Sequence, residues 1–199
     1  MSEADTGRPI VNIEGELVAL GPLRREHIPL YLHWMNDFAT AAMLATPPRP
    51  FTAAQETAWF EGVANDANRP TFTIYERSTW RPIGNCGLHV IDTVNRRTDV
   101  GIMIGDPAAR GKGYGTEAMR LLLDFAFTAL NMHSVMLTVY EYNAPARRSY
   151  EKVGFREIGR RREARWHNGR FWDEILMDIL ASEFDSPILR RLLDTEPKR

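Results

Sequence analysis

One segment, residues 106–127, constrains the fold of this chain more than any other. It reads DPAARGKGYGTEAMRLLLDFAF and follows the strand-like run RTDVGIMIG at residues 97–105. Apolar residues then recur at helical spacing, at Ala118, Leu122, Phe125 and Ala129. A glycine-rich turn between a strand and the start of a helix offers backbone N–H groups and a positive helix end to an anion. The segment therefore predicts a phosphate-binding loop.

Two common phosphate loops do not match this segment. A P-loop requires a hydroxyl residue after its lysine, whereas Gly113 follows Lys112. A dinucleotide-binding fingerprint requires a third glycine where this chain has Thr116. The remaining pattern, Arg110-x-x-Gly113-x-Gly115, suits a pyrophosphate that is bound without a metal ion. The hydroxyl of Thr116 is an additional candidate donor to the same phosphates.

The rest of the chain alternates between strand and helix patterns. Strand-like runs occupy residues 16–23, 71–76, 83–91, 97–105, 134–142, 155–164 and 171–181, and helical patterns occupy residues 25–37, 53–66, 115–130 and 143–154. We therefore expect one α+β domain at residues 12–181, with a mixed, mostly antiparallel sheet of about seven strands flanked by four helices. Residues 1–11 are expected to form a flexible lead. Residues 182–199 are expected to form an amphipathic helix or a loose tail.

Cap residues fix the ends of two of these helices. Thr52 and Gln55 predict a capping box at the start of the second helix. Asn143 is an N-cap for the fourth helix, and Gly154 stands just beyond its last turn.

Composition excludes several classes of function. The 199 residues carry a formal net charge of −1, which argues against binding DNA by bulk electrostatics. The polar first residues do not predict a signal peptide, and no apolar run approaches the ~18 residues of a membrane span. Cys86 is the only cysteine, so we expect no internal disulfide and a cytoplasmic location. The five histidines show no metal-ligand spacing, so no metal is expected.

Three ordered motifs resemble one enzyme family. The run GLHVIDTVNRRTDVGIMIGDPAARGKGYGTEAM, the segment NAPARRSYEKVGF and the closing run RFWDEILMDIL are similar to the GNAT acyltransferase superfamily, in its RimJ/RimL-like branch. The resemblance implies a GNAT fold and acetyl-CoA as co-substrate. It further implies transfer of the acetyl group to a primary amine, either a protein N-terminus or a small amine such as a polyamine, by direct attack on the thioester. A module that binds acyl-CoA as a sensor, without transfer, is the alternative.

The resemblance also assigns roles to individual residues. Tyr150 is implied as the general acid, and the alternative is a packed core tyrosine, because its spacing puts it on an apolar helix face with Ala146 and Val153. Asp99 and Glu141 are candidates for a general base, and an enzyme that relies on ordered water instead of a base is the other option. The residues expected to bind acetyl-CoA are Ile102, Met103, Ile104, Arg110, Gly111, Lys112, Gly113, Tyr114, Gly115, Thr116, Asn143 and Arg148.

The acceptor side is less defined by the sequence. The resemblance implies that the N-terminal helices and the last hairpin wall the acceptor pocket, with Trp34 and Trp172 as candidate lining residues. Residues 12–66 carry seven acids against three arginines, which predicts an acidic wall that attracts a cationic amine. Residues 156–170 carry six arginines against two glutamates, which suits an acidic partner or a second subunit, so a homodimer is left open.

Overall fold

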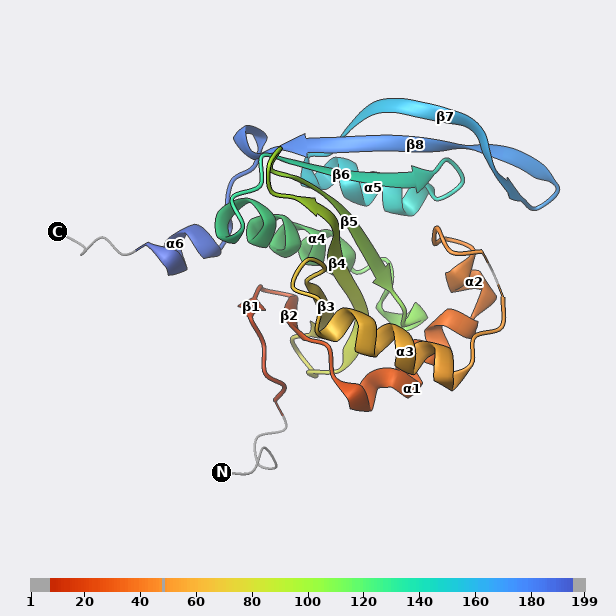
Figure 1. Cartoon of the computed structure of the whole chain (residues 1–199), viewed down its shortest axis with the longest axis horizontal. Helices are drawn as coiled ribbons and strands as arrows, with labels where there is room; N and C mark the ends of the chain where they lie inside the picture. Colours follow the sequence, from red (N-terminus) through yellow and green to blue (C-terminus); the bar gives the residue numbers. More distant parts are fainter. Residues whose placement is uncertain (1–7, 48, 195–199) are drawn as a thin grey trace.

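The computed structural model describes residues 8–47 and 49–194, and these form one eight-stranded sheet with helices on both faces (Figure 1). The strands lie in the order β1-β2-β3-β4-β5-β6-β8-β7. Their bounds are β1 Ile13–Glu14, β2 Val18–Pro22, β3 Thr71–Glu76, β4 Pro82–Asp92, β5 Arg97–Ile104, β6 Ser134–Tyr140, β7 Arg156–His167 and β8 Arg170–Leu180. The expected α+β class and mixed sheet are confirmed.

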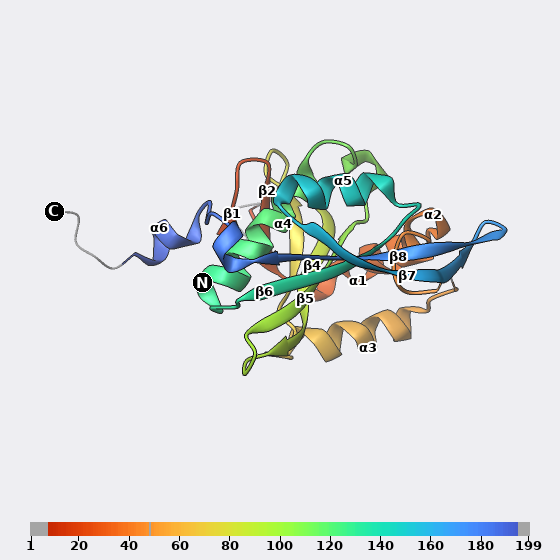
Figure 2. The ribbon, with the colours of Figure 1, turned by 90° about the horizontal axis from the view of Figure 1, so that it is seen from above.

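The helices divide between the two faces of the sheet. Their bounds are α1 Ile28–Asn36, α2 Phe38–Ala41, α3 Ala53–Ala64, α4 Tyr114–Asp124, α5 Ala144–Val153 and α6 Leu189–Leu193. The view from above shows α4 and α5 on one face and α3 on the other (Figure 2). The capping box of Thr52 and Gln55 and the N-cap of Asn143 are both present, so these helix starts are confirmed.

Two clusters of apolar side chains hold the layers together. The larger cluster lies between the sheet and α4, where Leu121, Leu122 and Leu123 are fully buried. The smaller cluster joins α1 and α3 to the opposite face and includes Tyr31, Phe60 and Met103. Successive residues of β5 therefore contribute to different clusters, because strand side chains alternate between faces. Met103 points to the α1–α3 side, and Val100 belongs to the α4 side.

The junction between β5 and β6 is the irregular place in the sheet. These two strands run parallel, and their pairing covers only Arg97–Asp99 against Ser134–Met136. Beyond it, β5 continues to Ile104 beside β4, and β6 continues to Tyr140 beside β8. The edge of β5 from Gly101 onward therefore has no pairing with β6.

The structure adds three elements to the sequence prediction. The short β1 extends the sheet to eight strands, and α2 forms a single turn after α1. The helix that begins with α4 ends in a π-helical turn at Phe125–Ala129. Of the predicted lead and tail, residues 1–7 and 195–199 lie outside the described residues.

The described part of the C-terminal segment packs on the domain. Phe184 and Leu189 are buried in the larger cluster. The buried carboxylate of Asp124 accepts hydrogen bonds from the Ser186 hydroxyl and from the backbone N–H groups of Ile188 and Leu189. Residues 184–189 are thus fixed to the end of α4, and Leu189–Leu193 form the short helix α6, so of the helix and the loose tail expected here, this stretch has a helix.

Candidate functional site

A cleft of about 520 Å³ opens where β5 and β6 separate. One wall is the end of β5, from Ile102 to Ile104, with the glycine loop that follows it. The other wall is α5, whose lining residues run from the N-cap Asn143 to Lys152. Thr40 and Met43, in α2 and just after it, close one end. The cleft therefore brings the glycine segment and the Asn143 segment together, although about 30 residues separate them in the sequence.

The glycine loop adopts a backbone conformation that side chains disfavour. Gly111 has φ of 74° and Gly113 has φ of 86°, both in the left-handed region that suits glycine. Gly113 is the N-cap of α4, so the free N–H groups of the first helical turn begin here. A Cβ on Gly115 would stand 3.4 Å from Cγ1 of Ile104, so the loop and the end of β5 lie close together at this glycine. The loop is a cradle of backbone donors at the positive end of a helix.

The wall formed by α5 carries two polar side chains and one tyrosine. Oδ1 of Asn143 accepts a 3.3 Å hydrogen bond from the N–H of Ala146. The hydroxyls of Thr116 and Ser149 lie 2.8 Å apart and connect α4 to α5. Tyr150 lines the cleft, and burial raises the pKa of its hydroxyl to about 12. Its proton is therefore held throughout the neutral pH range.

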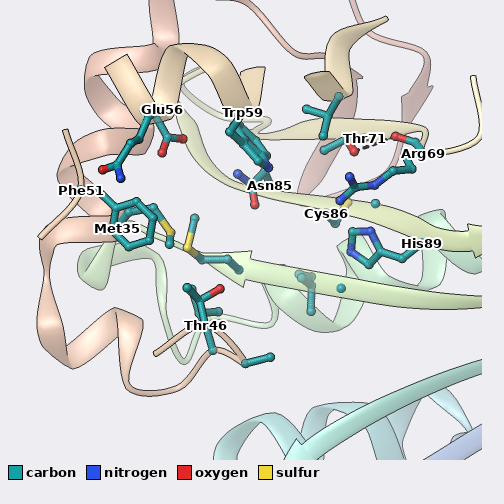
Figure 3. Close-up of a pocket in the computed structure, with 18 of the residues that line it drawn as sticks. Met35, Thr46, Phe51, Glu56, Trp59, Arg69, Thr71, Asn85, Cys86 and His89 are labelled. Carbon is teal, nitrogen blue, oxygen red and sulfur yellow. Dashed lines mark hydrogen bonds between the residues drawn. The ribbon is translucent and has the colours of Figure 1, made fainter. Parts of the chain in front are cut away.

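A second pocket of about 480 Å³ lies on the opposite side of β5, beneath α3 (Figure 3). Asn85, Gly87 and His89 on β4 line it, with Gly101 on β5. A Cβ on Gly101 would stand 2.8 Å from Nε2 of His89, so the lack of a side chain there leaves room for the imidazole. The helix α3 supplies Glu56, Trp59 and Val63, and the segments before and after it supply Arg49, Phe51 and Arg69.

The two pockets share residues of β5. Ile102 and Met103 line both, as does Leu44 from the segment after α2. Because adjacent strand residues point to opposite faces, a group in the cleft and a group in the second pocket can meet at this part of the strand. Both pockets therefore border the same part of β5.

Comparison with known families decides what kind of protein has this architecture. The model of the acetyltransferase (GNAT) domain matches residues 18–156 of the chain. The chain belongs to this family. It is therefore an N-acetyltransferase, and acetyl-CoA is its co-substrate.

Several relatives resemble this GNAT chain over most of its length. The uncharacterized N-acetyltransferase p20 of Bacillus licheniformis is 30% identical over 76% of this chain and 85% of its own. Spermidine N(1)-acetyltransferase of Escherichia coli K12 is 29% identical over 84% of this chain and 88% of its own. The human alpha/beta-tubulin-N-acetyltransferase 9 is 28% identical over 72% of this chain and 74% of its own.

A solved structure supports the fold. Spermidine N-acetyltransferase from Vibrio cholerae, in complex with CoA and spermine, superposes with a TM-score of 0.78 at 26% identity. The match covers 85% of this chain and 98% of the other. Within the described residues, no helix is long and apolar enough to cross a membrane, and no group of three or more histidine, cysteine, aspartate or glutamate side chains is arranged to hold a metal ion.

Most of the residues predicted to bind acetyl-CoA line the cleft. They are Ile102, Met103, Ile104, Arg110, Gly111, Gly113, Gly115, Thr116, Asn143 and Arg148. The guanidinium of Arg110 is engaged, because Nη2 donates to Oγ1 of Thr40 at 2.6 Å and Nε donates to the carbonyl of Ile104 at 3.1 Å. Arg110 therefore braces the loop against α2, whereas Arg148 has no carboxylate partner among the described residues.

Two loop residues depart from the prediction. Lys112 is exposed and does not line the cleft, and its charge acts on Glu76 instead. The hydroxyl of Tyr114 donates a 2.6 Å hydrogen bond to Glu76, so its ring pins the start of α4 to β3. Neither side chain lines the cleft.

The two candidate bases lie apart from the shared strand residues. Asp99 stands opposite His89 on β4, and burial raises the pKa of its carboxyl. It belongs to the stretch where β5 is still paired with β6 and lines neither pocket. Glu141 is exposed and accepts a 3.3 Å hydrogen bond from Arg160. Neither position supports the predicted role.

The two tryptophans predicted to line the acceptor pocket are engaged elsewhere. Trp34 is 2% exposed, and a Cβ on Gly105 would stand 2.1 Å from its ring, so this side chain is packed core. Trp172 lies in the β7–β8 hairpin, donates from Nε1 to the carbonyl of His167 and carries the Arg170 guanidinium 3.5 Å above its ring. The tryptophan that lines the second pocket is Trp59. Its position in an amphipathic helix gave no local signal that distinguished it from a core residue.

Proposed function

We propose that this enzyme transfers the acetyl group of acetyl-CoA to a small primary amine by direct attack on the thioester. The observation that carries the proposal is the meeting of the two pockets at Ile102 and Met103. The cleft on the α4–α5 side would hold the donor, and the pocket beneath α3 would hold the acceptor. A reaction that joins two substrates requires both to reach one point with little freedom of orientation.

The donor fits the cleft chemically. The backbone N–H groups of the loop from Gly111 to Gly115 suit a pyrophosphate, since a helix N-terminus and left-handed glycines concentrate donors there. The free edge of β5 beyond Gly101 suits an extended pantetheine arm, which can pair with a strand edge through its amides. Asn143 and Arg148 lie along the same cleft and complete the donor site in this proposal.

The chemical step follows from this arrangement. The amine nitrogen forms a bond to the acetyl carbonyl carbon, a backbone N–H of β5 stabilises the oxyanion, and the carbon–sulfur bond breaks with its electron pair on sulfur. Tyr150 gives its hydroxyl proton to the departing thiolate. One proton leaves the ammonium before the attack. A second leaves the nitrogen as the amide forms and replaces the proton given by Tyr150.

Burial of Tyr150 is compatible with this role. A raised pKa makes a phenol a weaker acid, but the same dry environment also disfavours a thiolate. The proton is therefore transferred between two groups whose charged forms are both destabilised. This is a favourable match for a general acid, because the driving force for the transfer stays small in either direction.

A protein N-terminus is the second candidate acceptor. The RimJ/RimL-like motifs in residues 87–119 favour it, and the human relative is named a tubulin N-acetyltransferase. The pocket beneath α3 favours a small molecule, since about 480 Å³ is a typical volume for one. The RimJ/RimL-like assignment, the cytoplasmic location and the homodimer stay predictions.

A free-thiol assay tests the proposal. The enzyme is mixed with acetyl-CoA and a panel of polyamines, amino acids, other small amines and N-terminal peptides, and release of the CoA thiol is followed. We expect turnover with small amines above the slow hydrolysis seen without acceptor. Turnover with peptides alone would favour the protein N-terminus. Tight binding of acetyl-CoA with no turnover on any amine would favour the sensor alternative.

A further inference from the structure

The pocket beneath α3 contains one buried carboxyl group, that of Glu56, which has no partner among the described residues. Glu56 is 5% exposed and belongs to the lining of the pocket. No hydrogen bond or ion pair links its carboxyl to another residue in the described part of the chain. Burial alone raises its pKa. An unpaired carboxylate in this position is costly, so it suits a ligand that brings a positive charge.

The other acids of the N-terminal third do not share this pocket. Among the described residues, Glu56 is the single acid that lines it, whereas the sequence predicted a wall of seven acids. Ion pairs or helix caps hold most of the rest: Glu14 binds Arg77, Glu26 binds Arg24, Glu61 binds Arg25, and Asp37 caps α2. The expected acidic wall is therefore wrong, and the pocket offers one negative position instead of a row of them.

The far end of the pocket is positive. In Figure 3, the side chain of Arg69 extends into the pocket above His89, on the opposite side from Glu56. No carboxylate pairs with Arg69 among the described residues. Burial, together with the charge of Arg69, lowers the pKa of His89, and Nδ1 of this imidazole is buried without a hydrogen-bond partner. This end therefore offers an unpaired guanidinium and a neutral imidazole.

The two ends define a ligand with two charges of opposite sign. Trp59 and Asn85 lie between Glu56 and Arg69 in Figure 3. A second arginine, Arg49, also lines the pocket, and its guanidinium lies 4.9 Å from the ring centre of Phe51, which is on the Glu56 side in Figure 3. A polyamine would bring ammonium groups toward these arginines, which is unfavourable. An amine with an anionic group can place its ammonium at the unpaired Glu56 carboxylate and its anionic group at Arg69.

We propose that the acceptor is a small amine that also bears a carboxylate or phosphate group, with its ammonium at Glu56 and its anionic group at Arg69. This inference rests on the acetyl transfer proposed above. Glu56 takes one proton from the ammonium, and the nitrogen that becomes free attacks the thioester. A carboxylate destabilised by burial is a better proton acceptor than an exposed one, which suits this step.

Matched pairs of amines test the charge preference. β-Alanine is compared with β-alaninamide, and phosphoethanolamine with ethanolamine, so that each pair differs in the anionic group. Spermidine serves as the polycation. We expect kcat/KM for at least one anionic member to exceed that of its neutral twin by about tenfold or more. The two pairs separate a carboxylate from a phosphate.

The Arg69→Gln variant tests whether the Arg69 guanidinium causes the preference for amines with an anionic group. We expect this variant to bring the ratio within each pair to near one while it still turns over the neutral amines. Arg120→Gln, on the exposed side of α4 and outside both pockets, is the matched control and should keep the wild-type ratio. A preference that survives in Arg69→Gln overturns the assignment of Arg69.

Glu56→Gln tests the other end. We expect turnover of both members of a pair to fall at neutral pH and to recover in part near pH 10, where more of the amine is already unprotonated. Unchanged turnover at neutral pH overturns the role of Glu56. Equal or faster turnover of spermidine or of the neutral twins overturns the acceptor class but leaves the acetyl transfer intact. No turnover of any amine overturns both.

Discussion

The two pockets that meet on β5 are built in opposite ways. The cleft proposed for the donor is made chiefly of two continuous segments, residues 102–116 and 142–152, and the glycine loop contributes its backbone N–H groups. The pocket proposed for the acceptor is lined by residues from α1, from α3 and the segments around it, and from β4 and β5. The backbone conformation of a loop is determined by residues close in the sequence, such as glycines and helix caps. A pocket of side chains depends on which helix and sheet faces meet, which no single segment specifies.

The largest effect is expected for a side chain of the cleft, the Tyr150 hydroxyl. Tyr150→Phe should lower kcat by about 10²-fold or more, because loss of a general acid typically costs 10²–10⁴-fold. Binding of acetyl-CoA should change little, since the ring remains. Steady-state kinetics and calorimetric titration with CoA measure the two effects. Tyr140→Phe, outside both pockets, is the control. A kcat within threefold of wild type would remove Tyr150 from the mechanism.

A smaller effect, on acetyl-CoA affinity, is expected when the backbone of the glycine loop is disturbed. Gly113→Ala places a Cβ at φ of 86°, a conformation that costs about 1–2 kcal/mol for a residue with a side chain. The loop relieves this strain by moving its N–H groups, so we expect acetyl-CoA affinity to fall by about tenfold. Titration calorimetry on the folded variant measures it.

A second glycine provides the control for this substitution. Gly62 lies inside α3, and a Cβ there meets no atom within 4 Å. Gly62→Ala should therefore leave acetyl-CoA affinity unchanged and stabilise the helix by about 0.5–1 kcal/mol. If folded Gly113→Ala binds acetyl-CoA as tightly as wild type, the loop does not hold the phosphates.

The same contrast explains what the sequence could predict. The fold, the capping residues and the glycine loop were readable because each depends on neighbours within a few residues of the chain. Asp99 was proposed as a base from its place in a motif, but the pairing of β5 with β4 and β6 decides what Asp99 faces. Glu56 was visible only as one acid in a charge count. Its significance is its lack of a partner, and partners are a property of the packed structure.

The tryptophans show the limit most clearly. Trp34 and Trp59 both lie in N-terminal helices with apolar neighbours. The local sequence therefore does not show which of the two is a core residue and which lines a pocket. The structure buries Trp34 against Gly105 and exposes part of Trp59 to the acceptor pocket. The difference arises because α1 packs at the end of β5, whereas α3 spans the pocket that the glycines of β4 and β5 leave open.

Two conservative substitutions sharpen this distinction. Trp59→Phe should raise KM for the acceptor about three- to tenfold and change the melting temperature little, because the ring is half-buried and borders the pocket. Trp34→Phe should lower the free energy of unfolding by about 1–3 kcal/mol and leave acceptor KM unchanged. Kinetics and thermal unfolding of both variants measure the pair. The opposite result, with Trp34→Phe changing KM alone, would return Trp34 to the acceptor site.

The smallest expected effect concerns stability. The folded protein raises the pKa of Glu56, so it holds this proton more tightly than the unfolded chain, in which the pKa is about 4.3. Stability is therefore lost as the pH rises from that value through the raised pKa. Glu56→Gln avoids the buried charge and should melt about 2–4 °C higher than wild type at pH 8, for a gain of about 1 kcal/mol. The difference should vanish near pH 4.

A neighbouring glutamate makes this measurement decisive. Glu61 lies on the same helix, is exposed and pairs with Arg25 at 3.1 Å, so Glu61→Gln should give no gain that grows with pH. If wild type is as stable as Glu56→Gln at pH 8, the Glu56 carboxylate has a partner within the fold and is not available to an ammonium. The alternative outcome is that Glu56→Gln melts higher than wild type at pH 8 and that the acceptor, added to wild type, raises its melting temperature to the same value. This result would identify the Glu56 carboxylate as a charge that the substrate ammonium pairs with. In that case the pocket proposed for the acceptor lowers the stability of the free protein, and a bound ammonium restores it.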